Sequence, residues 1–186
     1  MPYNFPNDEK EQDRLDMSHH MCLLLLDDKL HLAELPEDRA IRVLDIGTGT
    51  GGWIELQDFN TLAYSEDGSA QDDNKIIEFC RVFNAACDKI GRHGSPGQYL
   101  KGWIEEAGFI NVHHDIRKVP VGPWARDKKL KQIGGIFRVN LEELLEAALL
   151  GLLVRVENWR PEEVQVFIAQ IREALRDRSV HLMEEL

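Results

Sequence analysis

The stretch Arg42-Val-Leu-Asp-Ile-Gly-Thr-Gly-Thr-Gly-Gly-Trp-Ile-Glu-Leu-Gln-Asp58 decides how this chain is expected to fold. Its apolar start, at residues 43–46, predicts a buried strand. The alternating glycines within residues 47–51 predict a loop whose bare backbone can lie close against a ligand. Residues 53–59 then predict a second strand, although a helix normally follows such a loop. The stretch therefore indicates a ligand site with an unusual connection after it.

The composition predicts one acidic domain in a reducing compartment. The chain has 186 residues, with 33 Asp and Glu against 22 Lys and Arg, so its net charge is −11. That charge argues against nucleic acid and anionic membranes as partners. The three cysteines form no C-x-x-C pair, the N-terminus has no apolar signal region, and the longest apolar run, residues 21–26, cannot span a bilayer. We therefore expect an intracellular protein, cytoplasmic or nuclear.

Hydrophobic spacing and turn residues predict an alternation of helices and strands in the first two thirds of the chain. The expected elements are a helix at 15–26 capped by Asp13, strands at 41–46 and 53–59, a polar loop at 65–74, a helix at 75–90 that buries Cys80 and Cys87, a short helix at 99–107 ended by Gly108, and a strand at 109–121 broken by Pro120.

The last third predicts two helices. An apolar stripe runs through residues 141–156, and Asn140 is the expected N-cap of that helix. Pro161 stands at the favoured first-turn position of the next helix. The expected buried face of that helix is Val164, Phe167, Ile168, Ile171 and Leu175.

Motifs spread over nearly the whole chain occur in an order that is typical of one family. They are Tyr3-Asn-Phe-Pro-Asn-Asp-Glu9, Glu11-Gln-Asp-Arg-Leu-Asp16, His19-His20, Leu30-His-Leu-Ala33, the glycine stretch 43–51, Gly52-Trp-Ile-Glu-Leu-Gln-Asp58, Trp103-Ile-Glu-Glu-Ala-Gly-Phe109, Pro123-Trp124 and Arg176-Asp-Arg-Ser-Val-His181. Each motif is weak by itself, but the ordered set is specific. The chain resembles the fungal LaeA-like class I methyltransferases, the group that accompanies secondary metabolism.

The resemblance implies a Rossmann-like, doubly wound sheet that binds S-adenosylmethionine (SAM) at the carboxyl ends of its strands. Asp45, Gly47, Gly49 and Gly51 would line the cofactor, with the Asp45 carboxylate beside its cationic methionine end. The N-terminal segment, residues 3–16, would close over it. Methyl transfer by direct displacement chiefly needs orientation, so we assign no catalytic residue, and we expect no metal.

The family pattern also implies that a block of a helix and further strand–helix units is missing between Gly51 and Gly52. Parallel strands need a crossover of about a dozen residues or more, and residues 47–52 are too few. The two strands would form a hairpin, continue as one bent strand or pair with another chain, and exposed edges would favour self-association. Losing the block also removes the acidic residue that holds the cofactor ribose; Glu66 and Asp67 lie at a suitable spacing but in a polar loop.

The expected fold is therefore α/β, a truncated Rossmann-like class I methyltransferase fold with a reduced sheet and a largely helical C-terminal half. A single domain would cover residues 1–186, with an N-terminal segment and helix at 1–36, a sheet remnant at 37–125 and a helical region at 126–186. Arg160 stands where the family tends to have Ser or Thr, and losing such a cap costs about 1 kcal/mol.

Other motifs have simpler interpretations. The letters Gly47-x-Gly-x-x-Gly52 match a dinucleotide fingerprint, but no helix or acidic strand end follows. His19-His20 in a helix and His113-His114 in a strand point in different directions and cannot chelate in tandem, although His19 or His20 could lie in a cleft. The four tryptophans favour packing over a substrate cage.

The sequence thus predicts a SAM-dependent methyltransferase of the fungal secondary-metabolism type, acting on a small-molecule substrate, whose activity is weak or absent because of the internal deletion. The alternative is a non-catalytic, methyltransferase-derived interaction protein that binds a protein partner through the stripe at 141–156 or an exposed sheet edge. A third interpretation is a mistaken exon assignment across the codons for Gly51 and Gly52. The methyl acceptor and the oligomeric state do not follow from the sequence.

Overall fold

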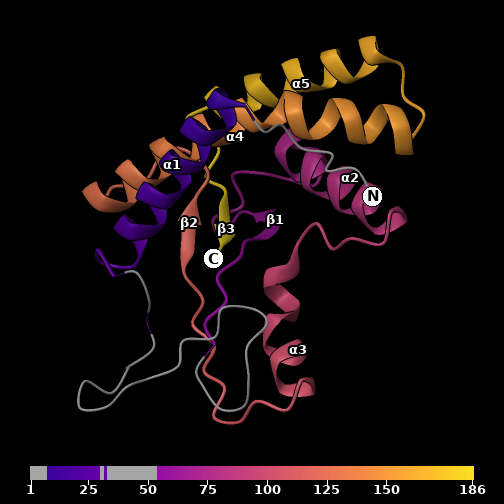
Figure 1. Ribbon diagram of the computed structural model, residues 1–186. Coiled ribbons are helices and arrows are strands. Elements are labelled where there is room, and N and C mark those ends of the chain that lie inside the picture. Colours follow the sequence, from indigo (N-terminus) through magenta and orange to yellow (C-terminus); the bar gives the residue numbers. More distant parts are fainter. Residues whose placement is uncertain (1–7, 30–31, 33–53) are drawn as a thin grey trace.

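The computed structural model describes residues 8–29, 32 and 54–186, which form a mixed α/β structure (Figure 1). Within these residues it contains five α-helices, one short 3-10 helix and three strands. In chain order they are α1 (Glu9–Leu25), β1 (Asn60–Tyr64), α2 (Lys75–Lys89), the 3-10 helix η1 (Pro96–Tyr99), α3 (Leu100–Glu106), β2 (Lys118–Pro120), α4 (Lys128–Val156), α5 (Pro161–Arg176) and β3 (Met183–Glu185).

The three strands form one small sheet in the order β1-β3-β2. β3 is the last strand in sequence but lies in the centre, and it pairs antiparallel with both neighbours. Because both outer strands oppose β3, β1 and β2 run in the same direction. Their amino ends therefore lie at one end of the sheet and their carboxyl ends at the other, which gives the sheet two distinct ends to consider for a site.

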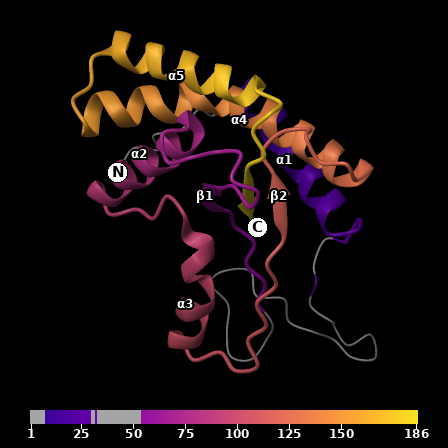
Figure 2. The ribbon, with the colours of Figure 1, turned by 180° about the vertical axis from the view of Figure 1, so that it is seen from behind.

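The helices gather around one end of this sheet. In both views α4 and α5 lie side by side at one end of the molecule, and α3 lies at the opposite end (Figures 1 and 2). α4 packs on α1, α5 and β2, while α2 packs on β1 and on both α4 and α5. The main core thus lies between the helices and the sheet face that they cover.

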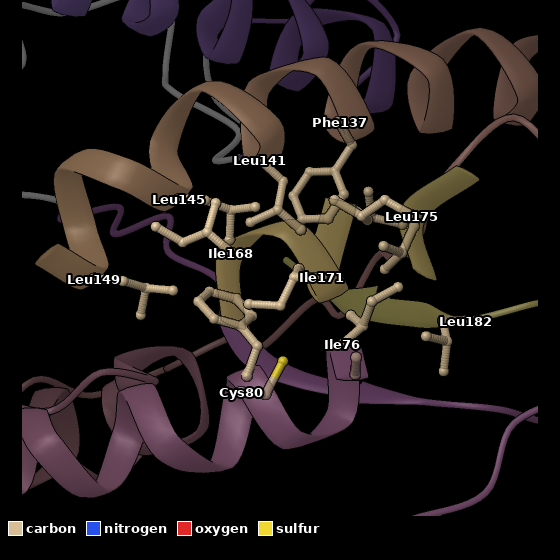
Figure 3. Close-up of a cluster of buried hydrophobic side chains, with 14 of the residues drawn as sticks. Ile76, Cys80, Phe137, Leu141, Leu145, Leu149, Ile168, Ile171, Leu175 and Leu182 are labelled. Carbon is tan, nitrogen blue, oxygen red and sulfur yellow. The ribbon is translucent and has the colours of Figure 1, made fainter. Parts of the chain in front are cut away.

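Apolar side chains from the two C-terminal helices fill this core. Figure 3 shows Leu145 and Leu149 of α4 and Ile168 and Ile171 of α5 directed towards α2, which contributes Cys80. All five side chains are buried. The expected buried face of α5 is confirmed in full, as is the burial of the two helical cysteines: Val164, Phe167, Ile168, Ile171, Leu175, Cys80 and Cys87 are all buried.

The first helix begins earlier than predicted. The expected start near residue 15 with Asp13 as cap is wrong, because α1 begins at Glu9 and Asp8 is the N-cap. The Asp8 carboxylate accepts a hydrogen bond from the backbone N–H of Glu11 at 2.9 Å. Two acidic residues in the first turn, Glu9 and Glu11, add a favourable interaction with the helix dipole.

The strand at 53–59 is also wrong where the structure describes it. Residues 54–59 form no regular strand, and the strand follows at Asn60–Tyr64. The outer edge of this strand is partly occupied, since the Asn84 side chain donates to the Thr61 carbonyl at 2.9 Å and the Gly97 N–H donates to the Phe59 carbonyl at 3.3 Å. The strand expected at 41–46 lies outside the described residues.

The long strand at 109–121 shortens to Lys118–Pro120, with Pro120 inside it. Asn111 has a positive φ of 58°, which interrupts an extended chain. Backbone pairing with the C-terminal segment starts only at Arg117, which exchanges two hydrogen bonds of 2.8 Å with Leu186. A turn follows β2 at Gly122, which has a φ of 113°.

Asn140 is not a helix cap. α4 begins twelve residues earlier than residue 140, at Lys128, and Asp127 caps it by accepting from the Leu130 N–H at 2.9 Å. Asn140 is buried inside the helix and accepts a hydrogen bond from Arg14 of α1 at 2.9 Å. The polar residue that suggested a helix start therefore connects two packed helices.

Four other predictions, for the loop at 65–74, the helix at 75–90, Gly108 and Pro161, are confirmed. The loop at 65–74 contains no regular element, α2 covers almost the whole predicted helix, and Gly108 follows α3 with φ of 90°. Pro161 opens α5, and although Arg160 replaces the expected Ser or Thr, the Glu163 carboxylate accepts from the Arg160 N–H at 2.9 Å. The division into segments 1–36, 37–125 and 126–186 stays a prediction, and the last segment also contains β3.

Candidate functional site at the amino ends of the parallel strands

The predicted cofactor residues lie outside the part of the chain that the structure describes. Asp45, Gly47, Gly49 and Gly51 all fall within residues 33–53. The described residues on either side of this segment, Leu32 and Ile54, can be placed, and both line the same cavity.

The two flanks of that segment are tied together by a side chain. The carboxylate of Glu55 accepts hydrogen bonds from the backbone N–H of Leu32, at 3.0 and 2.8 Å to its two oxygens. The Gln57 side chain donates to the same carboxylate at 2.7 Å. Glu55 therefore holds Leu32 beside the chain that resumes at residue 54.

The cavity has a volume of about 820 Å³ and lies at the amino ends of β1 and β2. Its walls include Asp58 and Asn60 at the start of β1, Ile116 and Arg117 just before β2, and Glu185 at the end of the antiparallel central strand. Further lining residues are Leu26, Leu56, Gly97, Gln98, Leu100, Lys101, Ile104 and the stretch 109–115. It is therefore placed at the end of the sheet opposite to that where the family resemblance puts a cofactor.

One wall of the cavity is only loosely attached to the rest of the protein. No residue of α3 is buried, and its principal packing partner among the described elements is η1. Ile110, in the stretch after α3, is 84% exposed although it is a large apolar residue. Exposed apolar side chains that lie together mark a binding surface more often than isolated ones do.

Glu185 is an acidic group of the central strand that lines the cavity. Its half-buried carboxylate accepts hydrogen bonds from the Tyr64 hydroxyl at 3.2 Å and the Asn60 side-chain amide at 3.3 Å. Lys118 pairs with Glu185 in the β2–β3 ladder, but its ammonium binds Glu66. Desolvation, and then the nearby Glu185 carboxylate, raise the pKa of the Tyr64 phenol.

A different cluster lies at the carboxyl ends of β1 and β2. His181, just before β3, places Nδ1 2.6 Å from the Asp67 carboxylate, and its ring stacks on Trp124 with ring centres 4.8 Å apart. Hydrogen bonds from Ser69 first, and then from His181, hold the pKa of Asp67 well below its usual range. The cluster fastens the loop after β1 to the start of the central strand. Glu66 and Asp67, considered above as ribose ligands, are thus engaged with Lys118 and His181.

Glu184 is a buried acid that the sequence pattern did not reveal. Its side chain is only 2% exposed and points to α2, where the Cys80 thiol donates a weak hydrogen bond at 3.8 Å. Desolvation raises the pKa of Glu184 to about 8. Desolvation, and then Glu184, also raise the pKa of the Cys80 thiol far above its usual range. The short motif around residue 184 has no periodicity that could have predicted this burial.

The two predicted histidine pairs lie in different surroundings from those expected, whereas the closure of residues 3–16 over the cofactor stays a prediction. His113 and His114 line the cavity, but the stretch that carries them is no strand. His19 and His20 are exposed on α1, and the described part of the N-terminal motif, residues 8–16, packs with α1 on α4 and lines no part of the cavity.

The described residues contain neither a metal-ligand cluster nor a membrane-spanning helix. No group of three or more His, Cys, Asp or Glu side chains is arranged to hold a metal ion in these parts of the chain. Likewise, no described helix is long and apolar enough to cross a membrane.

Several fungal proteins are similar in sequence to this chain. The methyltransferase pytC of Aspergillus terreus is 30% identical over 258 residues, which cover 96% of this chain and 79% of pytC. The probable methyltransferase tdiE of Emericella nidulans is 30% identical over 152 residues, 81% of this chain and 48% of tdiE. The secondary metabolism regulator laeA of Gibberella zeae is 24% identical over 248 residues, 88% of this chain and 78% of laeA.

The comparison with pytC also measures what this chain lacks. The match extends over 258 positions and the whole chain has 186 residues, so at least 72 of those positions face a gap here. No protein-family model matches the chain. No solved structure matches it either.

Proposed function

Since the chain belongs to the family of fungal secondary-metabolism methyltransferases that includes LaeA, we propose that it is a SAM-dependent methyltransferase by descent whose methyl transfer is weak or absent. Methyltransferases of this kind usually take SAM as the methyl donor. Asp45, Gly47, Gly49 and Gly51 are the proposed remnant of its binding loop. In an intact site these residues would orient the sulfonium methyl in line with the nucleophile of a small-molecule substrate.

The position of the flanking residues carries this proposal. Leu32 and Ile54 bracket the glycine segment, and both line the cavity at the amino ends of β1 and β2. Ile54 follows Gly51 by only three residues. In Rossmann-like folds the ligand lies at the carboxyl ends of the strands, whereas both of these flanking residues lie at the amino ends of β1 and β2.

The size of the gap against pytC supports the same conclusion. At least 72 positions of that relative have no counterpart, which is enough for two or more strand–helix units. We propose that the gap is the block missing between Gly51 and Gly52, and that the three-stranded sheet is a reduced Rossmann-like sheet. The carboxylate for the ribose would have been lost with it.

Calorimetric titration of SAM into the purified, folded chain tests the proposal. We expect no binding tighter than about 100 μM, roughly −5.5 kcal/mol, and no transfer of a labelled methyl group to extracts of fungal metabolites. Binding tighter than that would contradict the proposal if Gly49→Arg abolished it.

A matched control makes that outcome specific. Gly151→Arg adds the same side chain in α4, at a glycine whose added Cβ meets no atom within 4 Å. Tight SAM binding that Gly49→Arg removes and Gly151→Arg keeps would show a working glycine loop. Reading the transcript across the codons for Gly51 and Gly52 separately tests the exon interpretation, because a longer message would return the missing block.

The non-catalytic alternative loses one of its two proposed surfaces. The stripe at 141–156 is core, since Leu141, Leu145, Leu149 and Leu153 are all buried. A protein partner would therefore have to bind at an exposed sheet edge, which is the other surface proposed for this alternative.

A further inference from the structure

We propose that the cavity at the amino ends of β1 and β2 binds an apolar amine, whose ammonium group pairs with the carboxylate of Glu185. This site is separate from SAM binding and does not rest on residual methyl transfer. The size and lining of the cavity, the surroundings of Glu185 and the balance of charge all favour such a ligand.

The cavity has the dimensions and walls of a small-molecule site. Its volume of about 820 Å³ lies within the range of about 300–1,000 Å³ that is usual for ligand pockets. Leu56, Ile104, Phe109 and Val112 are among its apolar lining residues. Such walls favour a ligand with a sizeable apolar body over a bare metal ion or a sugar.

Glu185 supplies a fixed anchor for a positive charge. Its two hydrogen bonds come from neutral groups, the Tyr64 hydroxyl and the Asn60 amide, and both are longer than 3.1 Å. No Lys, Arg or His nitrogen lies within 4 Å of its carboxylate in the described chain. Because a half-buried carboxylate is poorly solvated, a cation that approaches it gains more than it would beside an exposed acid.

The charges around the cavity favour a cation over an anion. Four carboxylates line it, against one lysine, one arginine and two histidines. The arginine, Arg117, is already paired with Asp115 at 2.7 Å, and the lysine, Lys101, lies 3.8 Å from Glu105. The net charge of −11 on the whole chain adds a long-range attraction of the same sign.

Three probes with one naphthyl group test the proposal by calorimetric titration at neutral pH. They are naphthylethylamine, a cation; naphthylethanol, which is neutral; and naphthylacetate, an anion. We expect the amine to bind about tenfold tighter than the alcohol, and the acid to bind weakest. Glu185→Gln keeps the size and the hydrogen-bond acceptor, and it should bring the amine down to the affinity of the alcohol.

The alcohol serves as the internal control, because unchanged alcohol affinity in Glu185→Gln shows that the cavity is intact. Asp72→Asn removes one charge from the exposed loop beyond the carboxyl end of β1 and should leave all three affinities unchanged. Equal binding of amine and alcohol, or a preference that survives Glu185→Gln, would overturn the proposal. So would stoichiometric displacement of the amine by SAM, since the cavity would then be the cofactor site.

Discussion

The two ends of the sheet use apolar residues in opposite ways. At one end α4 and α5 place their apolar side chains at helical spacing, and residues such as Leu145 and Leu149 are completely buried. At the other end, the stretches 54–58 and 109–117 are also rich in apolar residues, yet Leu56, Ile110 and Ile116 are exposed. Apolar content by itself therefore did not determine burial. Regular spacing determined burial, because it placed the apolar side chains on one face of a helix, and that whole face could be covered by its neighbours.

The largest effect expected from this difference is on core packing. Leu145→Ala should lower the free energy of unfolding by about 4 kcal/mol, since it leaves a cavity where the side chain is fully buried. Ile110→Ala, at the other end of the molecule, should change it by less than about 0.5 kcal/mol. Urea unfolding of both variants measures the difference, and similar losses would show that the stretch after α3 is part of the core.

Glu184 gives the core a dependence on pH. Its pKa is about 8 in the folded protein and 4.5 in its ordinary state, so between these values the folded chain keeps a proton that the unfolded chain has lost. Stability should therefore fall as pH rises, by about 1.4 kcal/mol per pH unit, or roughly 3 kcal/mol from about pH 5.5 to about pH 7.5.

Unfolding curves across that pH range test this prediction. Glu184→Gln should remove the slope and raise stability most at the alkaline end. Glu173→Gln, on the exposed side of α5, should keep the slope of the parent chain. An unchanged slope in Glu184→Gln would mean that the buried carboxyl is ionised in the folded protein or accessible to water.

A smaller effect distinguishes two glycines within the same helix. A Cβ on Gly134 would overlap the carbonyl oxygen of Gly122, where α4 crosses the turn after β2, whereas one on Gly151 meets no atom within 4 Å. Gly134→Ala should cost about 2 kcal/mol, and Gly151→Ala should gain about 0.5–1 kcal/mol. Thermal unfolding compares the pair, and a gain from both would show that α4 can shift away from the sheet.

The sequence predicted the covered helices well because their signals are local. α2 nearly matches its predicted range, and α5 begins at the predicted Pro161, since turn or cap residues and a 3.6-residue apolar period fall in the same segment. Asn140 misled the prediction for α4 because a polar residue inside a helix can also be a long-range partner, here for Arg14. The strands were misplaced for a related reason. Their positions depend on β3, a three-residue strand too short to carry a pattern.

The candidate site was predictable only through the family motifs. Those motifs indicated Asp45 and the glycines, which lie outside the described residues, and a missing block; the match with pytC contains a gap of at least 72 positions. The cavity could not be foreseen. Its lining comes from six separate stretches of the chain, and its anchor, Glu185, owes its position to strand pairing at the far end of the sequence.

The central place of β3 has a consequence for biosynthesis. β1 and β2 are each paired with β3 and not with each other, and β3 follows every other described element in the chain. The helices α2, α4 and α5 can therefore meet while the protein is still being made, but the sheet cannot join until residues 183–185 have left the ribosome. Until then the side of this helical assembly that later covers the sheet remains open to water and to chaperones.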